Sequence, residues 1–271
     1  MLRRLFRRDP VSPPSLPAGE RAYAIGDIHG RADLFAAVIA AIDADDAART
    51  AAKTTVILLG DLIDRGPDSA GVIQLAREWQ VRRPKPEAVR IIMGNHEEML
   101  LDCLERPDML RHFLRYGGLE TAQSYGAMID VTGLQEWPPE KFSHAAAVIR
   151  AKLPEADLEY IRNFEDCIVL GDYAFVHAGI RPGVALERQL VSDLRWIREP
   201  FLSYRGSHGK VIVHGHTIAP EPQLRSNRIG IDTGAYQSGV LTTLGLEGTD
   251  RWLIQTQGDK GDITRISRSI A

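Results

Sequence analysis

Short apolar runs that stop at a glycine recur in the first hundred residues of the chain. A polar turn follows each run at once. Such a run is typical of a buried strand that ends at the rim of a sheet. We therefore predict three strands, at about 21–26, 54–59 and 88–93.

In the segments between these strands, apolar residues recur at the spacing of a helix. Leu34, Val38 and Ile42 form an apolar stripe within residues 31–49, and Pro67 opens a second helix. The polar turns are evenly spaced, and this spacing matches a strand–helix–strand crossover of about 30 or more residues. Right-handed crossovers between parallel strands place successive strand ends on one edge of a sheet, where open α/β sheets bind ligands.

From about 98 to 165 the pattern becomes helical, with breaks at the glycine pair 117–118 and the proline pair 138–139. Apolar runs then return, and two sheets covered by helices are the architecture that this order favours. We expect one domain over residues 19–271, with a helical insertion at about 98–165. The later strands are predicted at about 166–170, 173–177, 210–214, 228–232, 239–244 and 251–256.

Residues 1–18 combine a basic start with four prolines, which prevent a helix. We expect a disordered, solvated tail, and the alternative is a basic arm that touches anionic lipid or a partner. No apolar stretch follows the basic start, so the sequence predicts no signal peptide. No run reaches the roughly 18–20 apolar residues of a transmembrane segment.

Composition narrows the possible functions. The chain is 44% hydrophobic and 25% charged, as in ordinary globular proteins, and its net charge is −3. This acidic balance, without a basic and aromatic stripe, argues against nucleic acid as a partner. The two cysteines, Cys103 and Cys167, are far apart and not in a metal-binding spacing, which favours reduced thiols and a cytoplasmic location.

Metal-binding residue types follow the predicted strands. Asp27 and His29 share one turn, Asp61 and Asn95 follow the next two strands, and histidines end two later ones. Carboxylate, amide and imidazole ligands together suit Mn²⁺, Fe or Zn²⁺ better than a structural thiolate site. The candidate ligands at these strand ends are Asp27, His29, Asp61, Asn95, His177 and the two histidines His214 and His216.

Five motifs occur in one order: GDIHG at 26–30, GDLIDRG at 60–66, GNHE at 94–97, HAG at 177–179 and GHT at 215–217. In this order they resemble the calcineurin-like metallophosphoesterases, and within them the phosphoprotein phosphatase (PPP) family of bacterial type. The resemblance covers about 19–245. It implies a four-layer α/β/β/α sandwich of two mixed sheets.

The resemblance also implies two divalent metal ions, with Mn²⁺ favoured and Fe or Zn²⁺ as alternatives. One ion would be held by Asp27, His29 and Asp61, and the other by Asp61, Asn95, His177 and His216. Many relatives carry another ligating histidine where this chain has Ile218, so the first ion would keep open positions. His214 is expected to pack or to support the site without binding metal.

Further roles follow from the same resemblance. Arg65 and Arg198 would hold phosphate, and His96, oriented by Asp64, would donate a proton to the leaving oxygen. Arg195 competes with Arg198 for that role, and His96 has the alternative of only positioning Asn95 or the metal hydroxide. Glu97 would open the following helix. Asp232, in the segment 230–235, is either a turn residue or a substrate contact.

The implied activity is a phosphatase reaction on phosphomonoesters, by in-line attack of a hydroxide held between the two metals. The expected substrate is a phosphoprotein or phosphopeptide carrying phosphoserine or phosphothreonine, with phosphotyrosine as an option. The alternative is a symmetrical diadenosine tetraphosphate hydrolase, a sister family that typically has alanine at Asp64 and aspartate at Glu97. A non-catalytic scaffold is disfavoured because no candidate ligand is missing.

Overall fold

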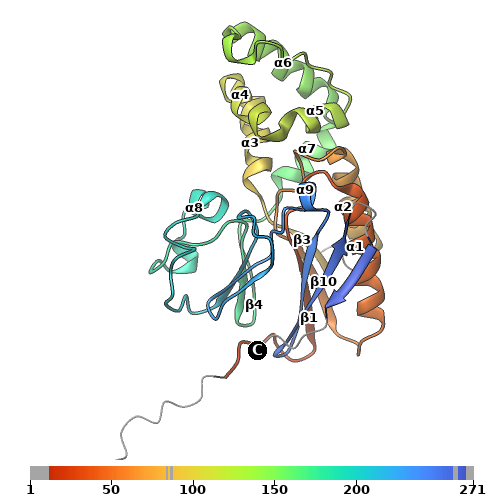
Figure 1. Cartoon of the computed structure of the whole chain (residues 1–271), viewed down its shortest axis with the longest axis vertical. Coiled ribbons are helices and arrows are strands. Elements are labelled where there is room, and N and C mark those ends of the chain that lie inside the picture. The colour runs from red at the N-terminus through yellow and green to blue at the C-terminus, as the bar shows by residue number, and fades with distance from the viewer. Residues whose placement is uncertain (1–11, 84, 86–87, 259–261, 267–271) are drawn as a thin grey trace, which may run out of the picture.

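Two mixed sheets packed face to face form the centre of the molecule (Figure 1). The computed structural model describes residues 12–83, 85, 88–258 and 262–266. The strand order is β11-β10-β9-β1-β2-β3 in one sheet and β4-β5-β6-β8-β7 in the other. The predicted α/β class with two mixed sheets is confirmed.

The first sheet contains the three predicted N-terminal strands as parallel neighbours. They are β1 (Glu20–Ile25), β2 (Lys53–Leu58) and β3 (Val89–Ile91). Helices α1 (Ala32–Ala47) and α2 (Ser69–Arg82) make the crossovers. Asp68 caps α2, since its carboxylate accepts the Gly71 N–H at 2.8 Å. The registers pair Ile25 with Leu58 and Leu58 with Ile91, so the three strands end level with one another.

Antiparallel strands extend this sheet and build part of the second. On the far side of β1 lie β9 (Thr242–Glu247), β10 (Asp250–Gln257) and β11 (Asp262–Ile266). The second sheet contains β4 (Ile168–Leu170), β5 (Tyr173–Phe175), β6 (Val211–His214), β7 (Gln223–Leu224) and β8 (Arg228–Gly230). The sequence did not predict β7 and β11, because both are edge strands fixed by pairing with one neighbour more than by an apolar pattern.

The segment between β3 and β4 is helical and projects from one end of the molecule (Figure 1). Its helices are α3 (Asn95–Glu105), α4 (Leu110–Phe113), α5 (Leu119–Ser124), α6 (Pro139–Lys152) and α7 (Glu155–Arg162). A π-helical turn over residues 114–118 joins α4 to α5. Among the residues placed in the structure, no helix combines the length and the apolar character needed to cross a membrane.

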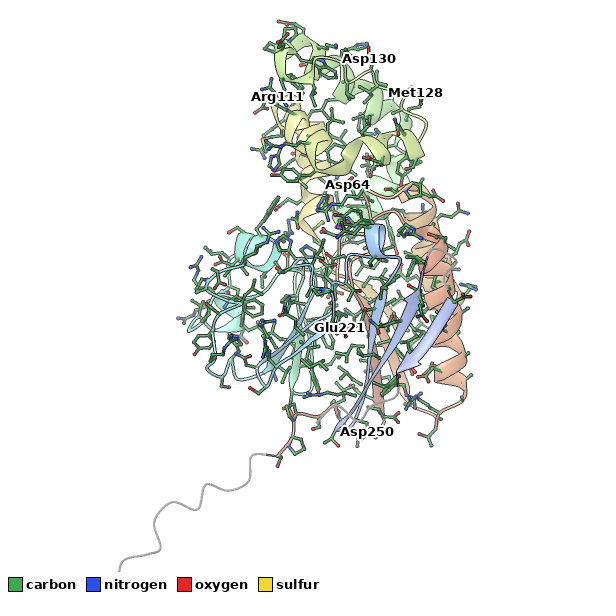
Figure 2. All side chains as sticks on the ribbon, viewed as in Figure 1. Asp64, Arg111, Met128, Asp130, Glu221 and Asp250 are labelled. Atoms are coloured by element: carbon green, nitrogen blue, oxygen red, sulfur yellow. The ribbon has the colours of Figure 1, made fainter. Side chains whose placement is uncertain are left out.

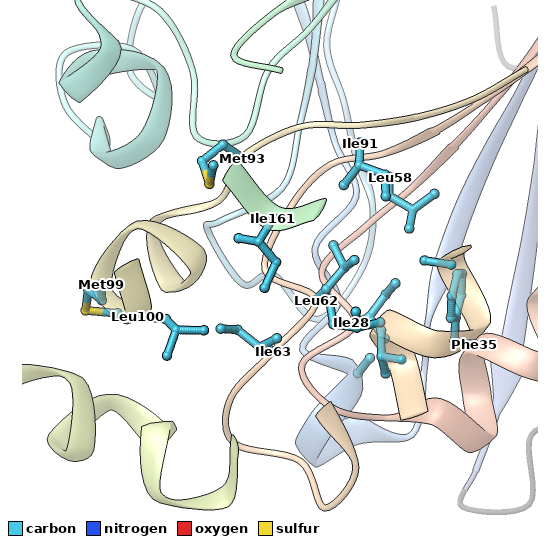
Figure 3. Packing of buried hydrophobic residues seen from close by; sticks show 14 of the residues in the cluster. Ile28, Phe35, Leu58, Leu62, Ile63, Ile91, Met93, Met99, Leu100 and Ile161 are labelled. Carbon is cyan, nitrogen blue, oxygen red and sulfur yellow. The ribbon is translucent and has the colours of Figure 1, made fainter. Parts of the chain in front are cut away.

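Three apolar layers hold these elements together. The first lies between the sheets and includes Ile57 and Phe175. The second lies between the first sheet and its helices and continues into the insertion. Figure 3 shows part of it, with Ile28, Leu62 and Ile63 pointing inward. The third covers the outer face of the second sheet with α8 (Val191–Trp196) and the segment after it.

The predicted N-terminal tail falls mainly on residues 1–11, which lie outside the described residues. The part from Ser15 onward contacts the body of the protein. The Leu16 N–H donates to the Gly248 carbonyl at 2.9 Å, and the Ser15 N–H donates to the Asp172 carboxylate at 2.9 Å. Leu16 is buried in the layer between the sheets.

Truncation of Ile57, which is fully buried between the sheets, tests the first layer. We expect Ile57→Ala to lower the free energy of unfolding by about 2–5 kcal/mol, because it removes buried methyl groups and leaves a cavity. Urea unfolding measures the change. Val81→Ala is the control, because Val81 is 82% exposed. A loss no larger than that of the control would contradict the assigned packing.

Candidate active site

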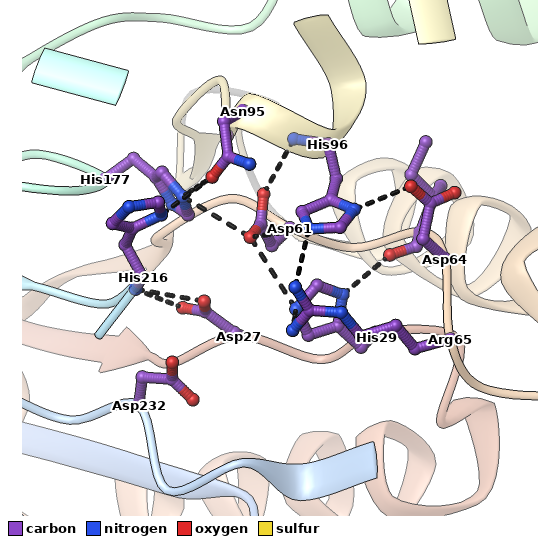
Figure 4. Close-up of polar contacts among 12 residues, drawn as sticks. Asp27, His29, Asp61, Asp64, Arg65, Asn95, His96, His177, His216 and Asp232 are labelled. Atoms are coloured by element: carbon purple, nitrogen blue, oxygen red, sulfur yellow. Dashed lines mark hydrogen bonds and ion pairs between the residues drawn. The ribbon is translucent and has the colours of Figure 1, made fainter. Parts of the chain in front are cut away.

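The polar turns after the strands meet at one buried site (Figure 4). Asp27 and His29 follow β1, Asp61 follows β2, and Asn95 opens α3 after β3. His177 and His216 follow β5 and β6 of the second sheet, so both sheets contribute. The side chains gather because the strands of each set are parallel and end at the same edge.

Asp61 lies at the centre of these groups. Its Oδ2 is 3.6 Å from His29 Nε2 and 3.4 Å from His177 Nε2. Two groups of possible metal ligands share it: His29, Asp61 and His96, and Asp61, His177 and His216. One carboxylate shared by two ligand groups is the arrangement that a dinuclear site needs.

Asn95 and Asp27 complete the predicted set. Asn95 Oδ1 lies 2.9 Å from His177 Nε2 and 2.7 Å from His216 Nδ1. The Asp27 carboxylate accepts the His216 N–H at 3.0 Å. The structure therefore brings all six predicted ligands together, although His96 and not Asp27 joins the tightest group around His29.

The state of the histidines fits metal binding. Burial lowers the pKa of His216 to about 2 and the pKa of His29 well below its usual value, so both rings are neutral, as ligation requires. His216 Nε2 is buried and has no hydrogen-bond partner among the described residues. Burial also lowers the pKa of His177, but the charge of Asp61 outweighs it and raises this pKa to about 10, so the site attracts positive charge.

Backbone strain is concentrated at the site. In the described ranges, the non-glycine residues with positive φ are His29, Asp61, Asp64, Arg65 and His216, with φ from 46° to 72°. L-residues rarely adopt this conformation, which costs of order 1–3 kcal/mol each. Three of them, His29, Asp61 and Asp64, directly adjoin apolar residues that are buried in the core.

Two glycines let the backbone approach the carboxylates. A Cβ on Gly94 would lie 2.2 Å from Asp61 Oδ1, and a Cβ on Gly215 would lie 2.0 Å from Asp27 Oδ1. Neither distance is possible between real atoms. The glycines of the GNHE and GHT motifs are therefore required by space at the site.

Glu97 has a larger role than opening a helix. Its carboxylate accepts N–H groups from Gly94 at 3.0 Å, Asp61 at 3.0 Å, Leu62 at 2.7 Å and Ile63 at 3.3 Å. It thus joins the turn after β2 to the start of α3. Burial and then the charge of Asp61 raise the pKa of Glu97 to about 7, whereas the four N–H groups favour its ionised form.

His96 and Asp64 form a buried pair. His96 Nδ1 lies 2.6 Å from Asp64 Oδ2, and His96 Nε2 lies 2.9 Å from Arg65 Nη2. Burial lowers the pKa of His96, but the charges of Asp61 and Asp64 together outweigh it, so the pKa lies above its usual value. The Asp64 carboxylate favours a proton on the His96 ring. Arg65 can only donate, so Nε2 can carry that proton only when the guanidinium turns away from it.

The two arginine candidates differ in their surroundings. Arg195 donates to Glu98 at 2.8 Å and lies 2.7 Å from Asp166, which ties it to the protein surface. Arg198 is exposed, and its positive charge is one of the smaller causes that lower the pKa of His216. Of the two, Arg198 is the one whose side chain forms no ion pair with another described residue. Arg65 lies inside it, with Nη1 2.8 Å from His29 Nε2.

One residue at the site could not be predicted from the sequence, and the sequence left the roles of two others undecided. The Arg65 guanidinium lies over the Tyr236 ring at 5.0 Å, but an isolated tyrosine in the short helix α9 (Ala235–Ser238) gives no signal in the sequence. Asp232 lies near Asp27, and after burial its charge is the main cause of the raised Asp27 pKa. His214 lies outside both ligand groups, with Nε2 3.3 Å from Arg228.

Residues 21–254 match the family model described as calcineurin-like phosphoesterase. The chain belongs to this family. The resemblance read from the five motifs is therefore confirmed at the level of the calcineurin-like phosphoesterases. Members are dinuclear metal-dependent hydrolases, and the two ligand groups around Asp61 agree with this.

Relatives of this calcineurin-like phosphoesterase differ in their named substrates. It is 24% identical to a symmetrical bis(5'-nucleosyl)-tetraphosphatase of Nitrosospira multiformis, over 90% of the chain and 98% of that protein. It is 28% identical to serine/threonine-protein phosphatase 1 of Salmonella typhimurium, over 81% of the chain and 89% of that protein. The solved structure of a cold-active protein tyrosine phosphatase shares the fold, with a TM-score of 0.59, 16% identity, and coverage of 93% of this chain and 81% of that one.

The Glu97 contacts predict the effect of an isosteric change. Glu97→Gln replaces one acceptor oxygen with an NH₂ group that faces backbone N–H donors. We expect metal affinity, measured by calorimetry, to fall about 10–100-fold, because support of a ligand loop is lost. Glu105→Gln, at an exposed position of the same helix, is the control. Equal affinities in both variants would show that Glu97 does not hold the loop.

Proposed function

We propose that this protein is a metal-dependent phosphatase of the PPP type that hydrolyses phosphomonoesters, with a phosphoprotein or phosphopeptide as its substrate. The observation that carries this proposal is the 2.6 Å contact between His96 and Asp64 beside the ligand groups. This pair supplies a general acid for a leaving oxygen that is a poor leaving group, such as that of a serine or threonine side chain.

The residues present fit two divalent ions. Asp27, His29 and Asp61 would hold one, and Asp61, Asn95, His177 and His216 the other. Mn²⁺ is the proposed metal, with Fe or Zn²⁺ as alternatives. When bound, the ions supply an activated water as nucleophile and neutralise phosphate charge.

The chain's own residues bind the ester and move the proton. Arg65 and Arg198 would hold the phosphate oxygens, since a guanidinium matches phosphate geometry with two parallel hydrogen bonds. His96 Nε2 would give its proton to the leaving oxygen, while Asp64 fixes the ring through Nδ1. The location we propose is the cytoplasm, because both cysteines are free thiols.

The second candidate is symmetrical hydrolysis of diadenosine tetraphosphate. The relative from Nitrosospira multiformis that carries this name covers 90% of the chain, and this observation supports the alternative. Against it stand Asp64, where that family typically has alanine, and Glu97, where it typically has aspartate. Glu97 reaches four N–H groups here, and an aspartate is one methylene shorter.

Removal of the proton donor tests the mechanism. We expect His96→Asn to lower kcat on phenyl phosphate by about 10²–10⁴-fold, the usual contribution of general acid catalysis. Metal content, measured by plasma mass spectrometry, should stay near that of the wild type. In the wild type, chelation followed by dialysis should abolish turnover, and Mn²⁺ should restore it. Activity that survives complete chelation would overturn the proposal.

A panel of substrates decides between the two candidate functions. Peptides with phosphoserine, phosphothreonine or phosphotyrosine are compared with diadenosine tetraphosphate at equal enzyme and Mn²⁺ concentration. We expect the largest kcat/KM for a phosphopeptide, because the His96–Asp64 pair favours leaving groups that need a proton. A clear preference for diadenosine tetraphosphate, with ADP as product, would favour the alternative.

A further inference from the structure

The helical insertion contacts the turn that carries Asp64 and Arg65. The Arg65 N–H donates to the Gly117 carbonyl at 3.0 Å. Gly117 has a φ of 105°, and a Cβ there would lie 2.6 Å from Arg65 Cγ. The π-helical turn at 114–118 thus rests directly on the arginine that we assign to phosphate binding.

Four residues further on, Thr121 reaches the acid pair itself. Thr121 Oγ1 donates to Asp64 Oδ1 at 2.6 Å, while Asp64 Oδ2 faces His96 Nδ1 at 2.6 Å. The two carboxylate oxygens therefore have separate partners on opposite sides. Thr121, Asp64 and Ser69 are all fully buried, so water does not replace these contacts.

The proton count fixes the direction of each hydrogen bond. A threonine hydroxyl has one proton, and here it goes to Asp64 Oδ1, since a carboxylate only accepts. Thr121 Oγ1 must then accept from the Asp64 N–H at 2.8 Å and from Ser69 Oγ at 2.9 Å. Ser69 Oγ accepts the Asp64 N–H as well, at 3.0 Å. This closed set of bonds holds Asp64 in its strained backbone conformation and in a single side-chain orientation.

We infer that Thr121 is a positioning residue for acid catalysis: it fixes Asp64 so that His96 points Nε2 at the leaving oxygen. The inference rests on the proposed function. It makes the insertion part of the catalytic unit, because Thr121 belongs to α5, whereas Asp64 belongs to the turn after β2 and His96 to the first turn of α3. Loss of the hydroxyl would free Asp64 to rotate and would weaken the hold on the His96 ring.

The test compares two esters that differ in their need for a proton. Phenyl phosphate has a poor leaving group, whereas p-nitrophenyl phosphate has a good one. We expect Thr121→Val to lower kcat on phenyl phosphate by about 10–100-fold and on p-nitrophenyl phosphate by less than about threefold, since only the first ester depends on the acid. Thr121→Ser keeps the hydroxyl and should retain most of the activity.

Thr54→Val is the matched control. Thr54 Oγ1 also donates to a carboxylate at 2.6 Å, that of Asp46, but it lies near the start of β2, at the end away from Asp61. This variant should not alter the ratio of the two rates. In a His96→Asn background, Thr121→Val should cause no further loss on phenyl phosphate, because the acid is already absent.

Equal losses on both esters, or an undiminished effect of Thr121→Val in the His96→Asn background, would overturn the inference and leave the proposed function intact. If the wild type hydrolyses neither ester, the proposed function fails separately. In that case the position of the His96 ring still tests the inference about Thr121. The NMR resonance of the His96 Nδ1 proton should move in Thr121→Val and not in Thr54→Val, and an unchanged resonance would refute it.

Discussion

The buried carboxylate of Asp61 is the group on which the rest of the site depends. Its Oδ2 lies within 3.9 Å of a nitrogen of each of three histidines, His29, His96 and His177, which come from three different turns. A buried anion is costly unless positive charge or hydrogen bonds compensate it. The parallel strands, the level strand ends and the close approach of the two sheets all serve to place these groups around one oxygen.

The same constraint explains why the turns are strained and why their neighbours are apolar. In the turns after β1 and β2, polar residues of the site adjoin Ile28, Leu62 and Ile63, which pack into the core (Figure 3). The buried side chains give the packing energy that offsets positive φ at the polar positions. Glu97 adds four hydrogen bonds to the same region, so the site is held by backbone contacts as well as by side chains.

Much of this could be predicted from the sequence. Glycine-terminated apolar runs located β1, β2 and β3, and five ordered motifs identified the family and gathered the six candidate ligands. Contacts between residues far apart in the sequence could not be predicted in this way. The role of Glu97 depends on the turn after β2 lying against the start of α3, and Tyr236 and Thr121 reach the site from segments far away in sequence. The edge strand β7 depends on pairing with β8, which no local pattern of side chains specifies.

The contact of Leu16 with Gly248 has a practical consequence for handling the protein. It lies where β1 begins, while the site lies where β1 ends, and six residues of strand separate the two by about 20 Å. Figure 2 shows the same separation, with Asp250 at one end of the sheets and Asp64 at the junction with the insertion. A purification tag, a surface linker or a fused partner joined directly ahead of Ser15 would therefore start at the end of the sheets opposite the candidate metal ligands.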